Sequence, residues 1–133
     1  MIQNQLAGNL SSLQGIPLAS VWEMWVVNLS PPPKFRRTLC ANHSRRYAKF
    51  IPRSTKIRKP NIHMFHLAAC QAPELFTKDG WFLLDKIFPI WNINEFHQRT
   101  RKYYGSLPDD IFEAILMCAR DFIDSQDSDR DVP

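Results

Sequence analysis

The first strongly patterned stretch of the chain covers about residues 16–29. Its large apolar residues recur at helical spacings and include Leu18, Val21, Trp22, Trp25, Val26 and Leu29. The alternating residues Val21, Trp25, Val27 and Leu29 would instead fit a strand, with Glu23 misplaced among them. We expect a helix here, with one short strand near 21–29 as the alternative. The prolines at 31–33 end either element, because proline lacks an N–H and disfavours α geometry before it.

Two further helices are predicted in the middle of the chain. Thr38 is a candidate N-cap for a helix that runs to about Phe50. Asn61 is a candidate N-cap for a helix that Pro73 closes. Between them, residues 51–60 read as a basic loop that contains two prolines and no glycine.

The C-terminal third predicts two more helices. One would cover residues 94–104 and stop at Gly105. The other would begin at Asp109, since Pro108 and a pair of aspartates suit the N-terminus of a helix. Its broad apolar face would consist of Ile111, Phe112, Ile115, Leu116, Cys118, Ala119, Phe122 and Ile123. We therefore predict a mainly α-helical fold, a compact single domain of about five or six short helices.

The length of 133 residues and a hydrophobic content of 44% fit one domain with a substantial core. Residues 1–15 are polar and rich in Gln and Asn, which predicts a flexible lead-in. Residues 16–124 would form a single helical domain. Residues 125–133 would form an acidic disordered tail, because they offer almost nothing to a core.

Charge is distributed unevenly along the chain. The fifty residues between Glu23 and Glu74 contain no acidic side chain, whereas residues 109–133 contain eight acidic and two basic ones. The basic residues of the acid-free stretch are Lys34, Arg36, Arg37, Arg45, Arg46, Lys49, Arg53, Lys56, Arg58 and Lys59. A field of one sign attracts polyanions and acidic partners.

The basic segment 34–59 favours a small non-enzymatic protein that binds the phosphate backbone of RNA or DNA with weak sequence selectivity. The aromatic residues Phe35, Tyr47 and Phe50 could stack on unpaired bases. A second basic and aromatic group could extend this surface, namely Arg99, Arg101 and Lys102 with Tyr103 and Tyr104.

Two other hypotheses explain the same distribution of charge. The first is an adaptor or inhibitor that binds an acidic protein surface, such as an accessory factor of a virus, a phage or a mobile element. The four tryptophans support it, because tryptophan is a preferred interface anchor. The second is self-association into a homo-oligomer, in which the basic middle of one chain meets the acidic tail of another.

Cysteine and histidine positions raise a metal-site hypothesis. On helices, Cys40 would share a face with His43, and His63 and His66 would share one with Cys70, giving a mixed ligand set that zinc accepts. The spacing does not match a zinc finger, so we expect no metal and no cofactor. His63 and His66 could also serve as an acid–base pair in RNA cleavage. With no further catalytic motif beside them, we expect that the protein is not an enzyme.

Three scattered cysteines and the lack of a leader pattern predict an intracellular protein, cytoplasmic or nuclear and not secreted. The longest apolar stretch, about residues 16–29, contains Glu23 and is too short to span a bilayer. We therefore expect no membrane partner.

Overall fold

The computed structural model describes residues 10–27, 33–57 and 59–131, with side chains described as far as Ile123. Seven strands form one antiparallel sheet in the order β4-β5-β3-β2-β1-β7, and β6 pairs with β3. The strands are β1 (Ser20–Val26), β2 (Lys34–His43), β3 (Ala48–Ser54), β4 (Met64–Leu67), β5 (Gly80–Leu83), β6 (Phe88–Ile90) and β7 (Thr100–Ser106). The helices of the described part are α2 (Ile93–Arg99) and α3 (Asp109–Asp131), with 3-10 turns η1 (Leu13–Gly15), η2 (Ala69–Gln71) and η3 (Leu84–Lys86).

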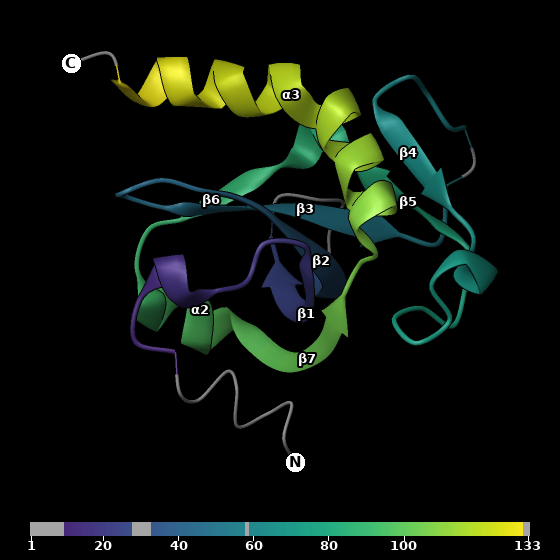
Figure 1. Ribbon diagram of the computed structural model, residues 1–133, viewed down its shortest axis with the longest axis horizontal. Helices are drawn as coiled ribbons and strands as arrows, with labels where there is room; N and C mark the ends of the chain where they lie inside the picture. The colour runs from purple at the N-terminus through teal and green to yellow at the C-terminus, as the bar shows by residue number, and fades with distance from the viewer. Residues whose placement is uncertain (1–9, 28–32, 58, 132–133) are drawn as a thin grey trace.

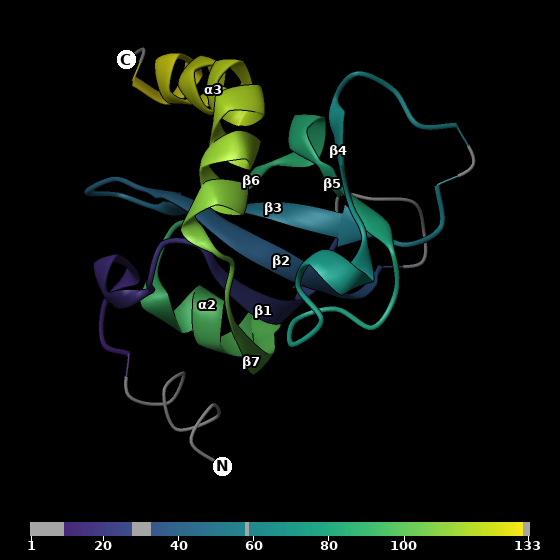
Figure 2. The same cartoon turned by 45° about the vertical axis from the view of Figure 1, so that its right-hand side comes forward.

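The sheet is the middle layer of the molecule. The long helix α3 crosses one of its faces, and α2 and η1 lie on the other (Figures 1 and 2). Each face carries its own apolar cluster: Val21, Leu39 and Ile51 pack with α3, whereas Trp22 and Phe50 pack with α2. The central strands are therefore buried on both sides.

The prediction of a mainly α-helical fold is wrong, because the chain forms a predominantly β structure. The region expected to form the first helix is strand β1. Neighbouring residues of β1 both need to be apolar, since Val21 faces one core and Trp22 the other. A strand buried on both faces loses its polar–apolar alternation, and its apolar residues then fall at helical spacings by coincidence.

The helix expected from Thr38 to Phe50 is a hairpin of β2 and β3. Its turn is closed by a hydrogen bond from Ser44 N to Tyr47 O of 2.8 Å. The Ser44 hydroxyl also accepts hydrogen bonds from two main-chain N–H groups of the turn, which is a recognised way for serine to compete with helix formation. Pro52 is accommodated in β3 because it lies between the residues that pair with β6 and those that pair with β5.

Two further predicted helices are also corrected. Asn61 does accept a hydrogen bond from His63 N (2.8 Å), but it caps a turn that leads into β4 and η2. The helix expected over 94–104 is the short α2 followed by β7. Asn92 caps α2 by accepting from Glu95 N at 2.8 Å, and the chain becomes extended at Thr100.

The predicted start of the last helix at Asp109 is confirmed. Its buried stripe consists of Phe112, Ile115, Ala119 and Ile123, with Ile111, Leu116 and Phe122 packed at the margin. Cys118 is exposed, contrary to the prediction. The helix bends near its middle (Figures 1 and 2). The buried Lys49 of β3 donates from Nζ to the main-chain oxygen of Ile123 (2.8 Å), which ties the second half of α3 to the sheet.

The division into a lead-in, a domain and a tail stays a prediction. Residues 1–9 of the lead-in lie outside the described part, and η1 within the lead-in buries Leu13. In the tail, α3 continues to Asp131, but residues 132–133 and the side chains after Ile123 lie outside the description. No helix in the described part is long and apolar enough to cross a membrane.

Gly105 of β7 provides a test of this fold. Its φ is +125°, and a Cβ there would lie 3.0 Å from Leu75 Cδ2. We expect Gly105→Ala to lower the free energy of unfolding by about 1–3 kcal/mol through backbone strain. Gly15→Ala is the control, because its Cβ would meet only ordinary contacts. Urea unfolding followed by tryptophan fluorescence measures both, and equal effects of the two substitutions would contradict the assigned β7 geometry.

Candidate functional site

The face of the sheet that carries α3 is open at one end. The register of β1 and β2 places three residue pairs in order along this face: Val21 with Leu39, Glu23 with Arg37, and Trp25 with Phe35. Residues two apart on a strand point to the same side, so all three pairs stand on this face. The first pair is buried in the α3 core, whereas no residue of the other two is fully buried. The apolar cluster beneath α3 therefore includes the first pair but not the second and third pairs.

A hollow of about 260 Å³ lies at this open end. It is lined by Glu23, Lys34, Phe35, Arg36, Arg37, Arg53, Thr55 and Tyr104. Four of these described lining residues are cationic and one is acidic, which gives the lining a formal charge of +3. Strands β1, β2, β3 and β7 or the ends just beyond them supply the described lining residues, so these residues stand on the sheet.

Glu23, the carboxylate among the described lining residues, already makes hydrogen bonds within the protein. Arg101 Nη2 donates to Glu23 Oε1 at 2.6 Å, and the Tyr104 hydroxyl donates to Glu23 Oε2 at 3.1 Å. Burial alone would raise the pKa of Glu23, but these two hydrogen bonds and the charges of Arg101 and Arg37 outweigh it and lower the pKa below its usual 4.5. Glu23 is therefore ionised at neutral pH, with both oxygens directed at Arg101 and Tyr104.

Aromatic rings hold the guanidinium groups in place. The Arg37 guanidinium lies 4.2 Å from the centre of the Tyr104 ring, and that of Arg101 lies 3.8 Å from the centre of the Phe35 ring. Such cation–π contacts help to fix the plane of a guanidinium. Burial lowers the pKa of Arg36, which also lines the hollow.

Arg53 carries a buried charge beneath this surface. Its Nη2 donates to the main-chain oxygens of Leu67 (2.9 Å) and Lys78 (2.8 Å), and its guanidinium lies 3.9 Å from the centre of the Phe76 ring. Burial, and then the charge of Arg37, lower its pKa to about 10, partly offset by Asp79. Arg53 therefore remains protonated at neutral pH.

Three arginine N–H groups of this region have no acceptor. They are the buried Nε groups of Arg36, Arg37 and Arg53, which make no hydrogen bond within the described part of the chain. A buried donor without an acceptor costs free energy, so unpaired groups in a native structure call for an explanation such as an ion or ligand. The three residues that carry these donors all line the cationic hollow, which favours an anion as its ligand.

The structure divides the ten basic residues predicted to bind nucleic acid. Lys34, Arg36, Arg37 and Arg53 line the hollow, and Lys56 and Lys59 are exposed beyond the end of β3. Lys49 is buried and bonded to α3. Arg45 and Arg46 are exposed at the tip of the hairpin, about 30 Å away at 3.3 Å per residue of β2. Arg58 lies outside the described residues.

The predicted stacking residues are also divided. Tyr47 and Phe50 are buried in the core and are not accessible to a base. Phe35 lines the hollow, where Arg101 and Tyr104 from the second predicted group join it. Sequence reasoning missed Glu23 and Trp25, because a helix was expected where β1 lies. Their shared face follows from the strand near 21–29 that was given as the alternative, because Val21, Glu23 and Trp25 are spaced two apart.

The predicted metal ligands do not gather at one point. Cys40 Sγ lies 3.6 Å from His43 Nε2, and burial raises the pKa of Cys40 to about 12. The His63 ring packs against Phe122, and that of His66 against Trp81. The helical spacing of His63, His66 and Cys70 gives no common face, because the segment is a turn, a strand and a 3-10 turn. No three metal-binding side chains cluster among the residues that the structure describes.

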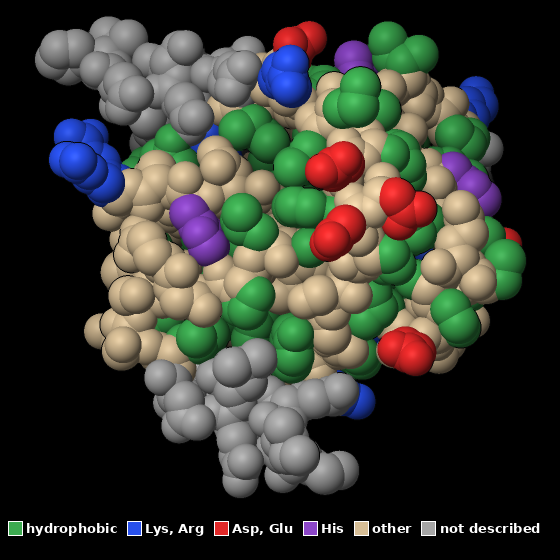
Figure 3. Space-filling model, in the orientation of Figure 1, with side chains coloured by type: hydrophobic (Ala, Val, Ile, Leu, Met, Phe, Trp, Pro, Cys, Tyr) green, Lys and Arg blue, Asp and Glu red, His purple; other side chains and the backbone are tan. Residues whose placement is uncertain are grey.

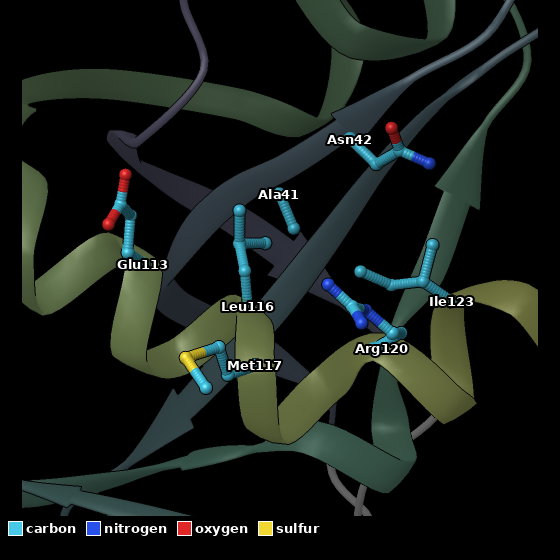
Figure 4. Close-up of a pocket in the computed structure, with 7 residues that line it drawn as sticks. All are labelled: Ala41, Asn42, Glu113, Leu116, Met117, Arg120 and Ile123. Atoms are coloured by element: carbon cyan, nitrogen blue, oxygen red, sulfur yellow. The ribbon is translucent and has the colours of Figure 1, made fainter.

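A larger hollow, of about 420 Å³, lies between α3 and β2 (Figure 4). Its charged lining residues are Glu113 and Arg120, which have opposite signs, and the rest includes Ala41, Leu116 and the exposed Met117. Acidic side chains also gather over the first half of α3 on the face that Figure 3 shows. Among its described lining residues this hollow concentrates neither charge nor unpaired donors, so the cationic hollow is the candidate site despite its smaller volume.

Comparison with known proteins does not assign this chain to a family. No protein-family model matches this sequence, and no curated protein matches it significantly. The function therefore has to be argued from the chemistry of the site.

The engaged carboxylate predicts a pH effect on stability. A carboxyl group with a lowered pKa in the folded protein stabilises it above the unfolded pKa, and this contribution is lost as the pH falls through the folded value. The stability of the wild type should therefore fall below about pH 4.5, and Glu23→Gln should make this part of the fall shallower. Urea unfolding at a series of pH values measures the slope. Glu74→Gln, at an exposed position, is the control; identical slopes for wild type and Glu23→Gln would contradict the contact.

Proposed function

We propose that the protein binds RNA or DNA by seating a backbone phosphate in the cationic hollow, without acting as an enzyme. The observation that carries this proposal is the set of three buried arginine Nε–H donors without acceptors, in a lining of net positive charge. Phosphate oxygens are strong acceptors, and charge-assisted hydrogen bonds from arginine are shorter and stronger than neutral ones. The hydrogen bonds of Glu23 to Arg101 and Tyr104 support the proposal, because a carboxylate that is already bonded competes less with a phosphate for the arginines of the hollow.

The size of the hollow supports a small anionic group. Its 260 Å³ is below the roughly 300–1,000 Å³ of pockets that enclose drug-sized ligands. A phosphate in such a recess is screened less by salt than one on an open surface. One negative charge would also reduce the mutual repulsion of the cations, since the charge of Arg36, followed by burial, lowers the pKa of Lys34.

Further cations around the hollow favour a polymer over a free anion. Lys34, Lys56, Arg101 and Lys102 are exposed and could reach phosphates on either side of the bound one. Contacts to phosphates carry no base information, so weak sequence selectivity follows. Arg45 and Arg46 are too distant to belong to the same short binding site. An intracellular location remains part of this proposal.

The binding of a labelled single strand of about five nucleotides tests the proposal, since this length lies within the range of single-strand sites and is too short to extend from the hollow to the hairpin tip. We expect log K to fall linearly with log salt concentration. Arg37→Gln should weaken binding about tenfold or more, because one charge-assisted contact is lost, and should reduce the salt slope by about 1. Fluorescence anisotropy across a salt series measures both quantities, and thermal unfolding verifies that the variant is folded.

Arg45→Gln is the matched control. The hairpin tip lies several Debye lengths from the hollow at about 0.1 M salt, so this substitution should leave binding unchanged. Equal losses from Arg37→Gln and Arg45→Gln would contradict a localised site. Salt-dependent binding of polyglutamate, with no binding of RNA or DNA, would overturn the proposal in favour of an acidic protein partner.

A further inference from the structure

We propose that Trp25 is a stacking platform for an unpaired base beside the hollow, so that the protein selects single-stranded over duplex nucleic acid. This inference rests on the proposed function, because the base would belong to the strand whose phosphate occupies the hollow. Trp25 is not among the described residues that line the hollow, and the charge pattern of the sequence does not point to it.

The position of Trp25 follows from the register of the sheet. Trp25 stands on the same face as Glu23, two residues farther from α3, which is a step of about 7 Å along β1. Its cross-strand partner is Phe35, which lines the hollow. The ring of Trp25 therefore lies within reach of a base whose own phosphate is bound by Arg37 and its neighbours.

The surroundings of Trp25 hold it in place and leave part of it exposed. Its ring meets that of Phe35 at 5.1 Å between centroids and an interplanar angle of 68°. Phe35 in turn packs against the guanidinium of Arg101, and Arg99 Nε donates to the main-chain oxygen of Trp25 at 3.0 Å. Nevertheless 38% of Trp25 remains exposed, whereas Trp22 of the same strand is fully buried. A large ring that is supported by an aromatic neighbour and partly exposed is suited to stacking.

Stacking on Trp25 would require an unpaired base. In a duplex each base is stacked on its neighbours and paired, so its face is not available to a protein side chain. Aromatic stacking is also tolerant of sequence, because every base has a π face. The inferred platform therefore adds selectivity for strandedness while leaving sequence selectivity weak.

Two labelled strands of about five nucleotides test this inference, one of natural nucleotides and one in which the bases are replaced by abasic sites. Both carry the same phosphates. The wild type should bind the natural strand roughly 5- to 100-fold more tightly. Trp25→Ala should remove this difference without changing the affinity for the abasic strand or the salt slope. Trp25→Phe should retain most of the difference, since an aromatic face remains.

Trp91→Ala is the matched control, because Trp91 is exposed to nearly the same extent (37%) but packs against Tyr47 at the other end of the β2–β3 hairpin. It should behave as the wild type. A wild type that binds both strands equally, or a Trp25→Ala variant that weakens both strands alike, would overturn the stacking role while leaving phosphate binding intact. Failure of the wild type to bind either strand would instead overturn the proposed function.

Discussion

The buried guanidinium of Arg53 is the interaction on which the arrangement of this half of the molecule depends. A buried cation is costly unless it is hydrogen-bonded, and here two main-chain oxygens and the ring of Phe76 surround it. These contacts bind β4 and the segment before β5 to the central strand. They also restrict the chain opposite, because a Cβ at Gly80 would lie 2.8 Å from Ser54 O and 2.9 Å from Arg53 Cζ.

The hydrogen bonds of Arg53 hold its positive charge at the hollow that it helps to line. Arg37 stacks on Tyr104, and Glu23 is held by Arg101 and by Tyr104, so these side chains are placed before any ligand arrives. Placing like charges together has a cost, which shows in the lowered pKa of Arg53 through burial and the charge of Arg37. An anion in the hollow would offset that cost. Such preorganisation reduces the ordering entropy that binding would otherwise require.

Parts of this arrangement could be predicted from the sequence. The acid-free stretch located the cations of the hollow, and the proline and aspartates around Asp109 located the start of α3. The fold could not be predicted in the same way, because much of β1 to β3 is buried on both faces and shows no clear polar–apolar alternation. Lys49 and Arg53 were predicted to be surface residues because their burial in β3 is not visible in the charge pattern of the sequence. Asn61 shows a further limit of sequence-based prediction. The same capping residue can begin a helix or a turn, and the packing of the following residues decides which one forms.

If a phosphate binds in the cationic hollow, as we propose, it should perturb the arginines that line the hollow. Their Nε–H groups can be followed directly in a proton–nitrogen correlation spectrum, because burial slows their exchange with water. On titration with a short single strand, we expect the Nε–H signals of Arg36 and Arg37 to shift and those of Arg45 and Arg46 to stay in place. Unchanged signals from Arg36 and Arg37 at saturation, or shifts confined to the hairpin tip, would contradict the proposal.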